Sequence, residues 1–453
     1  MKKIFFILIL CLQTGIYSQE AILNNYIVSG LKNNLALKQK QFLFEQSIAA
    51  LDEARGMFFP SIGINARYTR AGGGREINFP VGDLFNPIYG TLNALTHSNS
   101  FPTNLKNQII PFLREKEHDT KLSLVLPIVQ PALFYNYGIK SDLTEIKKAE
   151  KNVYERKLIS DIKNAYYNYL KSIEVNKIFL STIKLVKENL RVSESLFKND
   201  KITIDVVYRA KAELSEVEQK QMEAEKNIDL AKSYFNFLLN KPMESEIISE
   251  KEPVDMISID VDDLEKVALK NREELSQLNY AAEVAKGSVG LAKSKYLPGL
   301  VLAVDYGFQG EKYNFTKDDD YWMASLVLSW NLFNGFQDKA KAEQAEIEVK
   351  KYAAQVLEIK NQIRLQVKEA LKNYEIAKKT IKATEERLES FRKSFKIVKR
   401  KYAEGMAPQI EYLDARNKLT QAEVQAVIAK YDLKQKYAML EQVTALVDLK
   451  KYK

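Results

Sequence analysis

Two carboxylates in the last quarter of the chain have a spacing that could form a charged site. Glu411 and Asp414 lie three residues apart, so on a helix they share one face. Gly405, just before them, can take the positive φ that ends one helix, and Pro408 suits the first turn of the next. If several copies of the chain met here, the crowded carboxylates would repel one another and attract cations, as in a narrow pore mouth. Alternatively, both face solvent at a helix N-terminus, where acidic side chains are favourable.

Residues suited to catalysis or metal binding are scarce elsewhere. Cys11 is the only cysteine, and the two histidines, His97 and His118, fall in one long loop, where we expect exposed side chains. The triplet at 72–74 is all glycine but lacks the Lys-Ser/Thr of a phosphate-binding loop. The triplet at 318–320 is all aspartate, and a solvated charge run is a better interpretation than a cation site. We therefore predict no enzyme, no cofactor and no metal site.

Long helices must position the carboxylate pair. In the sequence before it, apolar residues recur at alternating three- and four-residue steps, broken only by Thr384, which predicts a coiled-coil seam. The seam comprises Val367, Ala370, Tyr374, Ala377, Ile381, Thr384, Leu388, Phe391, Phe395, Val398 and Tyr402. A helix over residues 338–404 would be roughly 100 Å long. An earlier stretch shows the same spacing, at Phe179, Ile183, Val186, Leu190 and Phe197, with Ser193 between.

Four short segments alternate apolar and polar residues with period two, as strands do. In the fourth, Trp322, Leu326, Leu328 and Trp330 share one face. The two tryptophans, the only ones in the chain, would be roughly 26 Å apart along a strand, which matches the aromatic girdles of an outer-membrane barrel. The alternative is a soluble sheet packed on helices by one face. Four strands cannot close a barrel, so a barrel needs several copies of the chain.

The chain repeats one plan: helix, strand, strand, helix, turn, helix. Pro60 and Pro298 each precede a strand, and Ser123-Leu124-Val125-Leu126 recurs as Ser325-Leu326-Val327-Leu328. We predict a signal peptide at 1–18, a first repeat at 19–242, a side element at 243–263 and a second repeat at 264–453. The first repeat has strands at about 60–71 and 120–128, a long loop at about 72–119 between them, and a helical hairpin at about 133–240. The second repeat has strands at about 299–309 and 321–332 and a hairpin at about 337–448.

Composition agrees with an exported, mainly helical protein. The 453 residues include only 17 Gly and 11 Pro, which favours long helices. Lys2, Lys3 and the apolar run that follows predict a signal peptide. The formal charge of +9 comes from alternating acids and bases rather than basic blocks, so we expect a solvated helix surface and no nucleic-acid partner.

These features together resemble the TolC family of outer-membrane efflux proteins. The most specific segments are LVLSWNLFNG, at 326–335, and KYAEGMAPQIEYLDA, at 401–415. The resemblance implies a mainly α fold whose four strands contribute to a twelve-stranded barrel in a homotrimer, with a long periplasmic α-barrel. It also implies the outer membrane of a Gram-negative bacterium, and an exit duct that works with a periplasmic adaptor and an inner-membrane transporter of the RND or ABC type.

The resemblance also assigns roles to residues. Glu411, Asp414 and Tyr402 would form the pore constriction, and Trp322 and Trp330 the membrane girdle. The hairpin tips would contact the adaptor, through Asn199, Asp200, Lys201, Gly405, Met406 and Ala407. Well-known members carry an arginine where this chain has Ala407, so their closing lock is altered here. Efflux of small toxic compounds is the predicted function; the alternatives are a type I protein secretion duct and a soluble periplasmic coiled-coil adaptor.

Overall fold

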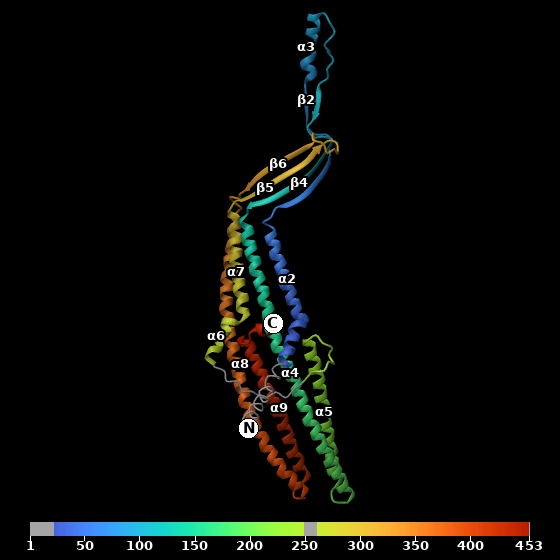
Figure 1. Ribbon diagram of the computed structural model, residues 1–453, viewed down its shortest axis with the longest axis vertical. Helices are drawn as coiled ribbons and strands as arrows, with labels where there is room; N and C mark the ends of the chain where they lie inside the picture. Colours follow the sequence, from blue (N-terminus) through green and yellow to red (C-terminus); the bar gives the residue numbers. More distant parts are fainter. Residues whose placement is uncertain (1–21, 249–260, 453) are drawn as a thin grey trace, which may run out of the picture. The chain divides into compact units, whose positions relative to one another are not determined.

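The computed structural model describes residues 22–248 and 261–452. The predicted signal peptide and residues 249–260 of the predicted side element lie outside the described residues. The chain forms two compact units: a helical unit of Met1–Ala50, Ile139–Lys286 and Glu346–Lys453, and a sheet unit of Leu51–Gly138 and Gly287–Ala345 (Figure 1). Each predicted repeat contributes to both units, and the division into repeats stays a prediction.

Long helices dominate the chain, which confirms the predicted fold class. After a helix at 22–33 come α2 (Leu35–Gly56), α4 (Pro131–Lys198), α5 (Ile204–Leu238), α6 (Val261–Asn271), α7 (Glu273–Lys293), α8 (Gln337–Ala403) and α9 (Gln409–Thr444), with short 3-10 helices at Ser294–Tyr296 and Leu449–Tyr452. None of the helices in the described ranges is long and apolar enough to cross a membrane.

Two helix breaks, which the sequence pattern did not predict, support the duplication. Asn34 separates the helix at 22–33 from α2; its Oδ1 accepts from Leu37 N at 3.0 Å, and its Nδ2 donates to Leu238 O at 2.9 Å. Arg272 separates α6 from α7 and donates to both carboxylate oxygens of Glu274 at 2.6 and 3.1 Å. The two breaks lie at the same distance before Pro60 and Pro298. Both repeats therefore interrupt the helix that leads into their first strand.

The predicted seam on α8 is buried, as expected. Val367, Tyr374, Phe395 and Val398 are all less than a tenth exposed, and they pack against α9 in two apolar clusters. On α4 the predicted seam is correct at Val186 and Ser193, which are fully buried, and wrong at Phe197, which is 39% exposed. The buried stripe there is mostly polar and comprises Thr182, Val186, Asn189 and Ser193. Polar partners on α9, described below, explain why these side chains turn inward.

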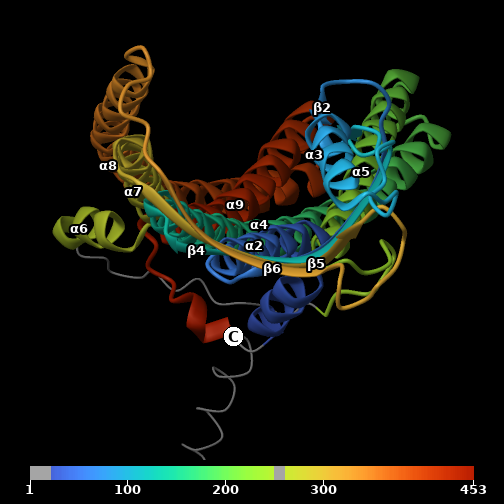
Figure 2. The same cartoon turned by 90° about the horizontal axis from the view of Figure 1, so that it is seen from above.

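The sheet unit holds four antiparallel strands in the order β1 (Ser61–Arg70), β4 (Lys116–Val129), β5 (Gly299–Gly310) and β6 (Asp320–Ser329). β1 pairs from Ser61↔Val125 to Arg70↔Lys116, and β6 pairs from Phe308↔Asp320 to Gly299↔Ser329. Figure 2 shows the strands as a curved band. Because β1 and β6 each have one neighbour, both edges of the sheet are open.

The two faces of this sheet differ in chemistry. One exposes large apolar side chains, among them Ile64 (77%) and Trp322 (76%). The other carries a polar network, in which Lys121 pairs with Asp305 at 2.7 Å and the Tyr321 hydroxyl donates to Asp119 at 2.9 Å. An exposed apolar face opposite an ordered polar face is typical of a strand layer with lipid on one side and water on the other.

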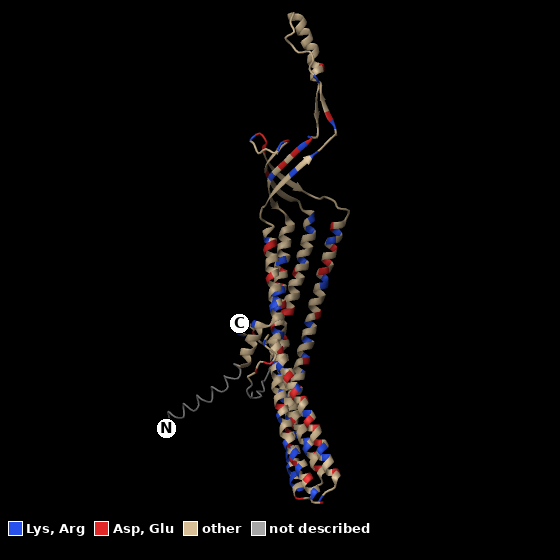
Figure 3. Cartoon of the chain, turned by 90° about the vertical axis from the view of Figure 1, so that its right-hand side faces the viewer, with Lys and Arg blue, Asp and Glu red and all other residues tan. Residues whose placement is uncertain are grey.

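The long loop between β1 and β4 contains an inserted module. It comprises β2 (Glu76–Phe79), α3 (Val81–Thr96) and β3 (Gln108–Pro111). Asn107 caps α3 from a distance: its Oδ1 accepts from Gly82 N and Asp83 N at 3.0 and 3.2 Å. Gly82 is required here, since a Cβ at this position would lie 2.2 Å from Leu105 O. Figure 3 shows that α3 carries few charges, whereas the long helices are charged along their length.

Candidate functional site: the hairpin tips

The two hairpin turns have the same backbone structure. Gly405, after α8, has φ 73°, and Asp200, after α4, has φ 54°. In the second turn Met406 N donates to Lys401 O and Gly405 N to Tyr402 O; in the first, Lys201 N donates to Leu196 O and Asp200 N to Phe197 O. This pair of bonds is the Schellman ending of a helix.

The predicted constriction acids lie on the exposed face of α9. Glu411 and Asp414 are exposed, whereas their neighbours Tyr412 and Leu413 are buried. Asp414 forms an ion pair with Lys418 one turn later, at 2.8 Å. The structure therefore presents both carboxylates to one side, as the three-residue spacing predicts, while the opposite side of the helix packs inward. Their place in a pore stays a prediction.

Tyr402 holds the end of α8 against two other helices. Its ring stacks on that of Tyr412 in α9, with centroids 4.8 Å apart, and its hydroxyl accepts from Asn189 Nδ2 in α4 at 3.4 Å. Gln409 adds two bonds from α9 to α4, since its Nε2 donates to Asn189 Oδ1 and Ser193 Oγ at 3.3 Å each. The buried polar stripe of α4 thus joins the two hairpins.

A buried ion pair that the sequence did not reveal lies one turn beyond Tyr412. Arg416 is 1% exposed, and its Nη2 donates to the Glu213 carboxylate in α5 and to Asn417 Oδ1. Burial raises the pKa of the Tyr412 hydroxyl, and the positive charge of Arg416 opposes that rise. The signal was present in the sequence: Arg416 lies four residues after Tyr412, on the buried side of an amphipathic helix.

The predicted tip residues differ in exposure. Asn199, Asp200, Lys201, Gly405 and Met406 are exposed. Ala407 is only 7% exposed, and its part in a docking surface stays a prediction. Thr203 precedes α5 but does not cap it with its side chain. Its hydroxyl instead donates to the Asp205 carboxylate, and this bond lowers the pKa of Asp205.

Both predicted girdle residues are exposed. Trp322, in β6, is 76% exposed; Trp330 follows the strand, is 57% exposed, and its Nε1 donates to Tyr296 O at 3.0 Å. Their role at a membrane stays a prediction.

The expectation for the histidines is half wrong. His97 is exposed at the end of α3, as expected. His118, however, lies within β4 and is fully buried, because the ring of Tyr313 covers it at 4.6 Å and Phe315 lies at 6.2 Å. Within the described ranges, no group of three or more His, Cys, Asp or Glu side chains could hold a metal ion.

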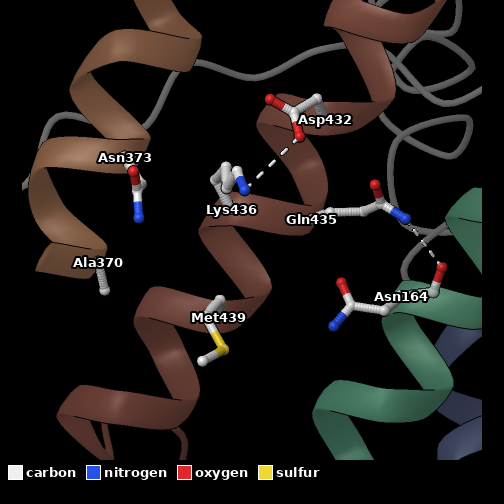
Figure 4. Close-up of a pocket in the computed structure, with 7 residues that line it drawn as sticks. All are labelled: Asn164, Ala370, Asn373, Asp432, Gln435, Lys436 and Met439. Carbon is white, nitrogen blue, oxygen red and sulfur yellow. Dashed lines mark hydrogen bonds and ion pairs between the residues drawn. The ribbon is translucent and has the colours of Figure 1, made fainter. Parts of the chain in front are cut away.

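A polar cleft of about 390 Å³ lies between α4, α8 and α9 (Figure 4). Gln435 Nε2 donates across it to Asn164 O at 3.2 Å, and Lys436 lies 3.9 Å from Asp432. Ala370, Asn373 and Met439 complete the lining. The residues drawn in the figure that carry charge are paired with each other, so this cleft offers nothing that predicts a particular ligand.

Comparison with known proteins agrees with the resemblance to outer-membrane efflux proteins. Residues 264–446 match the family described as outer membrane efflux protein. Outer membrane protein TolC of Escherichia coli (strain K12) is 20% identical over 455 residues, covering 95% of this chain and 84% of TolC.

Solved structures show the same fold. The CmeC outer membrane channel of Campylobacter jejuni has a TM-score of 0.76 at 16% identity, covering 93% of this chain and 85% of CmeC. The outer membrane protein VceC of Vibrio cholerae has a TM-score of 0.75 at 16% identity, covering 94% and 96%.

The family match, the similarity to TolC and the similarity to the solved channel structures all agree with the resemblance that the strand and hairpin segments suggested. The second half of the chain therefore matches the outer membrane efflux protein family, and the chain as a whole has the fold of outer-membrane proteins such as the CmeC channel and VceC.

Proposed function

We propose that three copies of this chain close their sheets into one twelve-stranded barrel that conducts solutes across the outer membrane. The observation that supports this proposal is the sheet itself. It has two open edges, β1 and β6, and a large exposed apolar face opposite a polar network. An open edge leaves backbone N–H and C=O groups unpaired, which is costly in lipid. Pairing β6 of one copy with β1 of the next would satisfy them.

Disulfide trapping tests this assembly. The predicted mature chain has no cysteine, so pairs of engineered cysteines report only on the designed contact. A series combining Asn65→Cys in β1 with Met323→Cys, Ser325→Cys or Val327→Cys in β6 should give covalent trimers in at least one register. Pairs between β1 and the central strand β5, such as Asn65→Cys with Ala303→Cys, are the control and should not cross-link subunits. Trapped dimers that never become trimers would refute the proposed stoichiometry.

The duct would serve as the exit of a tripartite efflux pump for small toxic compounds. The periplasmic adaptor would contact the exposed tip residues Asn199, Asp200, Lys201, Gly405 and Met406, and the adaptor would join the duct to an inner-membrane transporter. Charge reversal by Lys201→Glu, combined with Met406→Glu, should reduce co-purification of the adaptor and drug resistance. The exposed pair Glu145 and Lys148 on α4 offers a control, through Lys148→Glu. Unchanged pump assembly with altered tips would contradict the assignment.

At the tips, Glu411, Asp414 and Tyr402 would form the constriction. Three copies would place six carboxylates at one mouth, where they would attract cations. The double change Glu411→Ala with Asp414→Ala should reduce cation selectivity in single-channel recordings, whereas Glu145→Ala should not. Equal selectivity in all three proteins would show that the acids face away from the conducting path.

A further inference from the structure

A second cavity in the helical unit has a different character from the polar cleft of Figure 4. It has a volume of about 560 Å³ and lies between α4, α8 and α9. Ile178, Ile381, Leu388, Ala426 and Val427 form apolar walls. Cavities that bind drug-sized molecules are typically 300–1,000 Å³ and mostly apolar, with few polar groups. The volume of this cavity falls within that range, and five of its eleven lining residues are apolar.

Small side chains on the facing helices leave this space open. Ser181 in α4 and Thr384 in α8 both line the cavity, but their hydroxyls donate to their own helices. Ser181 Oγ donates to Ile178 O at 2.8 Å, and Thr384 Oγ1 donates to Thr380 O at 2.9 Å. With their hydrogen bonds satisfied locally, these residues add little polarity to the cavity. Thr384 is also the one polar position in the α8 seam, so the seam opens where the cavity lies.

One half-buried carboxylate in the wall lacks a counterion. Glu423 of α9 lines the cavity and forms no ion pair within the described ranges. Burial raises its pKa, and Arg392 opposes that rise. Two other charged groups near the cavity already form ion pairs: Lys430 pairs with Glu174 at 3.3 Å, and Arg392 lies 3.5 Å from Glu389. Lys177 and Glu385 are exposed at the rim.

We propose that this cavity binds an amphipathic organic monocation of drug size, with its apolar part between the walls and its charged nitrogen against the Glu423 carboxylate. The charge of the site selects the ligand. An anion in the cavity would be repelled by the Glu423 carboxylate. Lys177, the lining cation that forms no ion pair in the described part of the chain, lies at the rim and not inside the cavity. The apolar walls disfavour a small hydrated ion. The proposal does not depend on the duct, since the cavity lies within one copy of the chain.

Affinity should depend on pH in a defined direction. The cation binds the ionised carboxylate, and burial makes Glu423 hold its proton to higher pH than an ordinary glutamate. Binding should therefore weaken as pH falls through that raised pKa. The charged groups that face Glu423 from the packed helices are Lys177 on α4, Glu385 and Arg392 on α8, and Lys430 on α9.

Binding of rhodamine 6G, an amphipathic dye with a fixed positive charge, tests the proposal by fluorescence anisotropy on the purified full chain. Glu423→Gln should weaken binding about tenfold or more, since a hydrogen bond to a charged group contributes about 1.5–3 kcal/mol. Glu218→Gln is the matched control: it occupies the equivalent position of the first predicted repeat, where Glu218 is half-buried and pairs with Lys187 at 3.2 Å. This control should bind like the unaltered chain.

A second variant and a second probe complete the test. Ala426→Trp should fill the cavity and abolish binding while the helix content stays unchanged by circular dichroism. Fluorescein, an anion of similar size, should not bind. Equal dye affinity in Glu423→Gln and the unaltered chain, or equal binding of both dyes, would overturn the proposal. Neither result bears on subunit cross-linking, so failure of this site and failure of the proposed duct are distinguishable.

Discussion

The buried pair of Arg416 and Glu213 is the main electrostatic contact between α9 and α5 near the tips. Removing two charges from water is unfavourable, and their mutual attraction offsets this desolvation penalty only when the geometry is good and the remaining polar atoms are hydrogen-bonded. Here the penalty is only partly offset, because Arg416 Nε and Nη1 have no hydrogen-bond partner in the described part of the chain. The pair is thus a poor source of net stability but a strong constraint, since loss of either partner strands the other charge.

Removing the carboxylate charge of Glu213 should destabilise the helical unit far more than removing an exposed one. We expect Glu213→Gln to lower the free energy of unfolding by about 3 kcal/mol, the typical cost of leaving a buried charge unpaired. Asp414→Asn, which breaks the exposed pair with Lys418 (53% and 58% exposed), should cost about 0.5 kcal/mol or less. Urea titration followed by circular dichroism measures both. Equal effects would mean that water reaches Arg416.

Asp161 on α4 should make stability depend on pH. Burial raises its pKa, and Lys157 opposes the rise only in part. A pKa above that of the unfolded chain means that its stabilising contribution is present in acid and lost as pH rises through the folded-state value. Asp161→Asn, which mimics the protonated acid, should therefore raise the unfolding midpoint at neutral pH, and the gain should vanish in acid.

Asp205 provides the control with the opposite sign. The Thr203 hydroxyl lowers the pKa of Asp205, so its contribution is present at neutral pH and lost as pH falls through the lowered value. Asp205→Asn should lower the midpoint at neutral pH and have no effect in strong acid. Parallel shifts in the two variants would contradict the assigned causes.

At the scale of elements, the two hairpin turns have the same backbone conformation but different residues at the position after the helix. Both need a positive φ at the residue after the helix, which glycine adopts without cost and which Asp tolerates better than most. Gly405→Ala should therefore cost about 1 kcal/mol, whereas Asp200→Gly in the equivalent turn should be neutral or slightly stabilising. Hydrogen exchange of the amides at 401–407 and 196–203 would detect both local effects. Faster exchange in Asp200→Gly would contradict this account.

Periodicity explains which elements could be predicted. Long regular patterns, such as the α8 seam and the alternation in the strands, arise where one face of an element is apolar. In the structure that face is buried on α8 and exposed on the strands. The seam pattern did not include Asn189, because its side chain is polar and its hydrogen-bond partner Gln409 is distant in sequence. The burial of His118 likewise depends on Tyr313, which reaches it from another connection.

At the scale of the whole molecule, the inserted module is structurally separate from the sheet that carries it. Pairing of β1 with β4 continues to Arg70↔Lys116, and Ala71 N donates to Glu115 O at 2.9 Å, so the strand pair is already closed before the insertion begins. Hydrogen bonds within the module hold α3 against the segment that follows it. Asn86 exchanges two hydrogen bonds with the backbone of Leu105, and Asn93 exchanges two with the backbone of Phe101.

Deleting residues 75–112 and joining Gly74 to Leu113 should therefore preserve trapped trimers and single-channel conductance. The shortened connection would still contain three consecutive glycines, 72–74, which can form a turn at little steric cost. A longer deletion, of residues 66–120, is the control: it removes the strand pairs from Ala66↔Thr120 outward and should abolish the trimer. If the shorter deletion alone abolished it, the module would be a part of the assembly interface, and its exposed apolar residues, such as Leu95 (74%), would be the first to substitute.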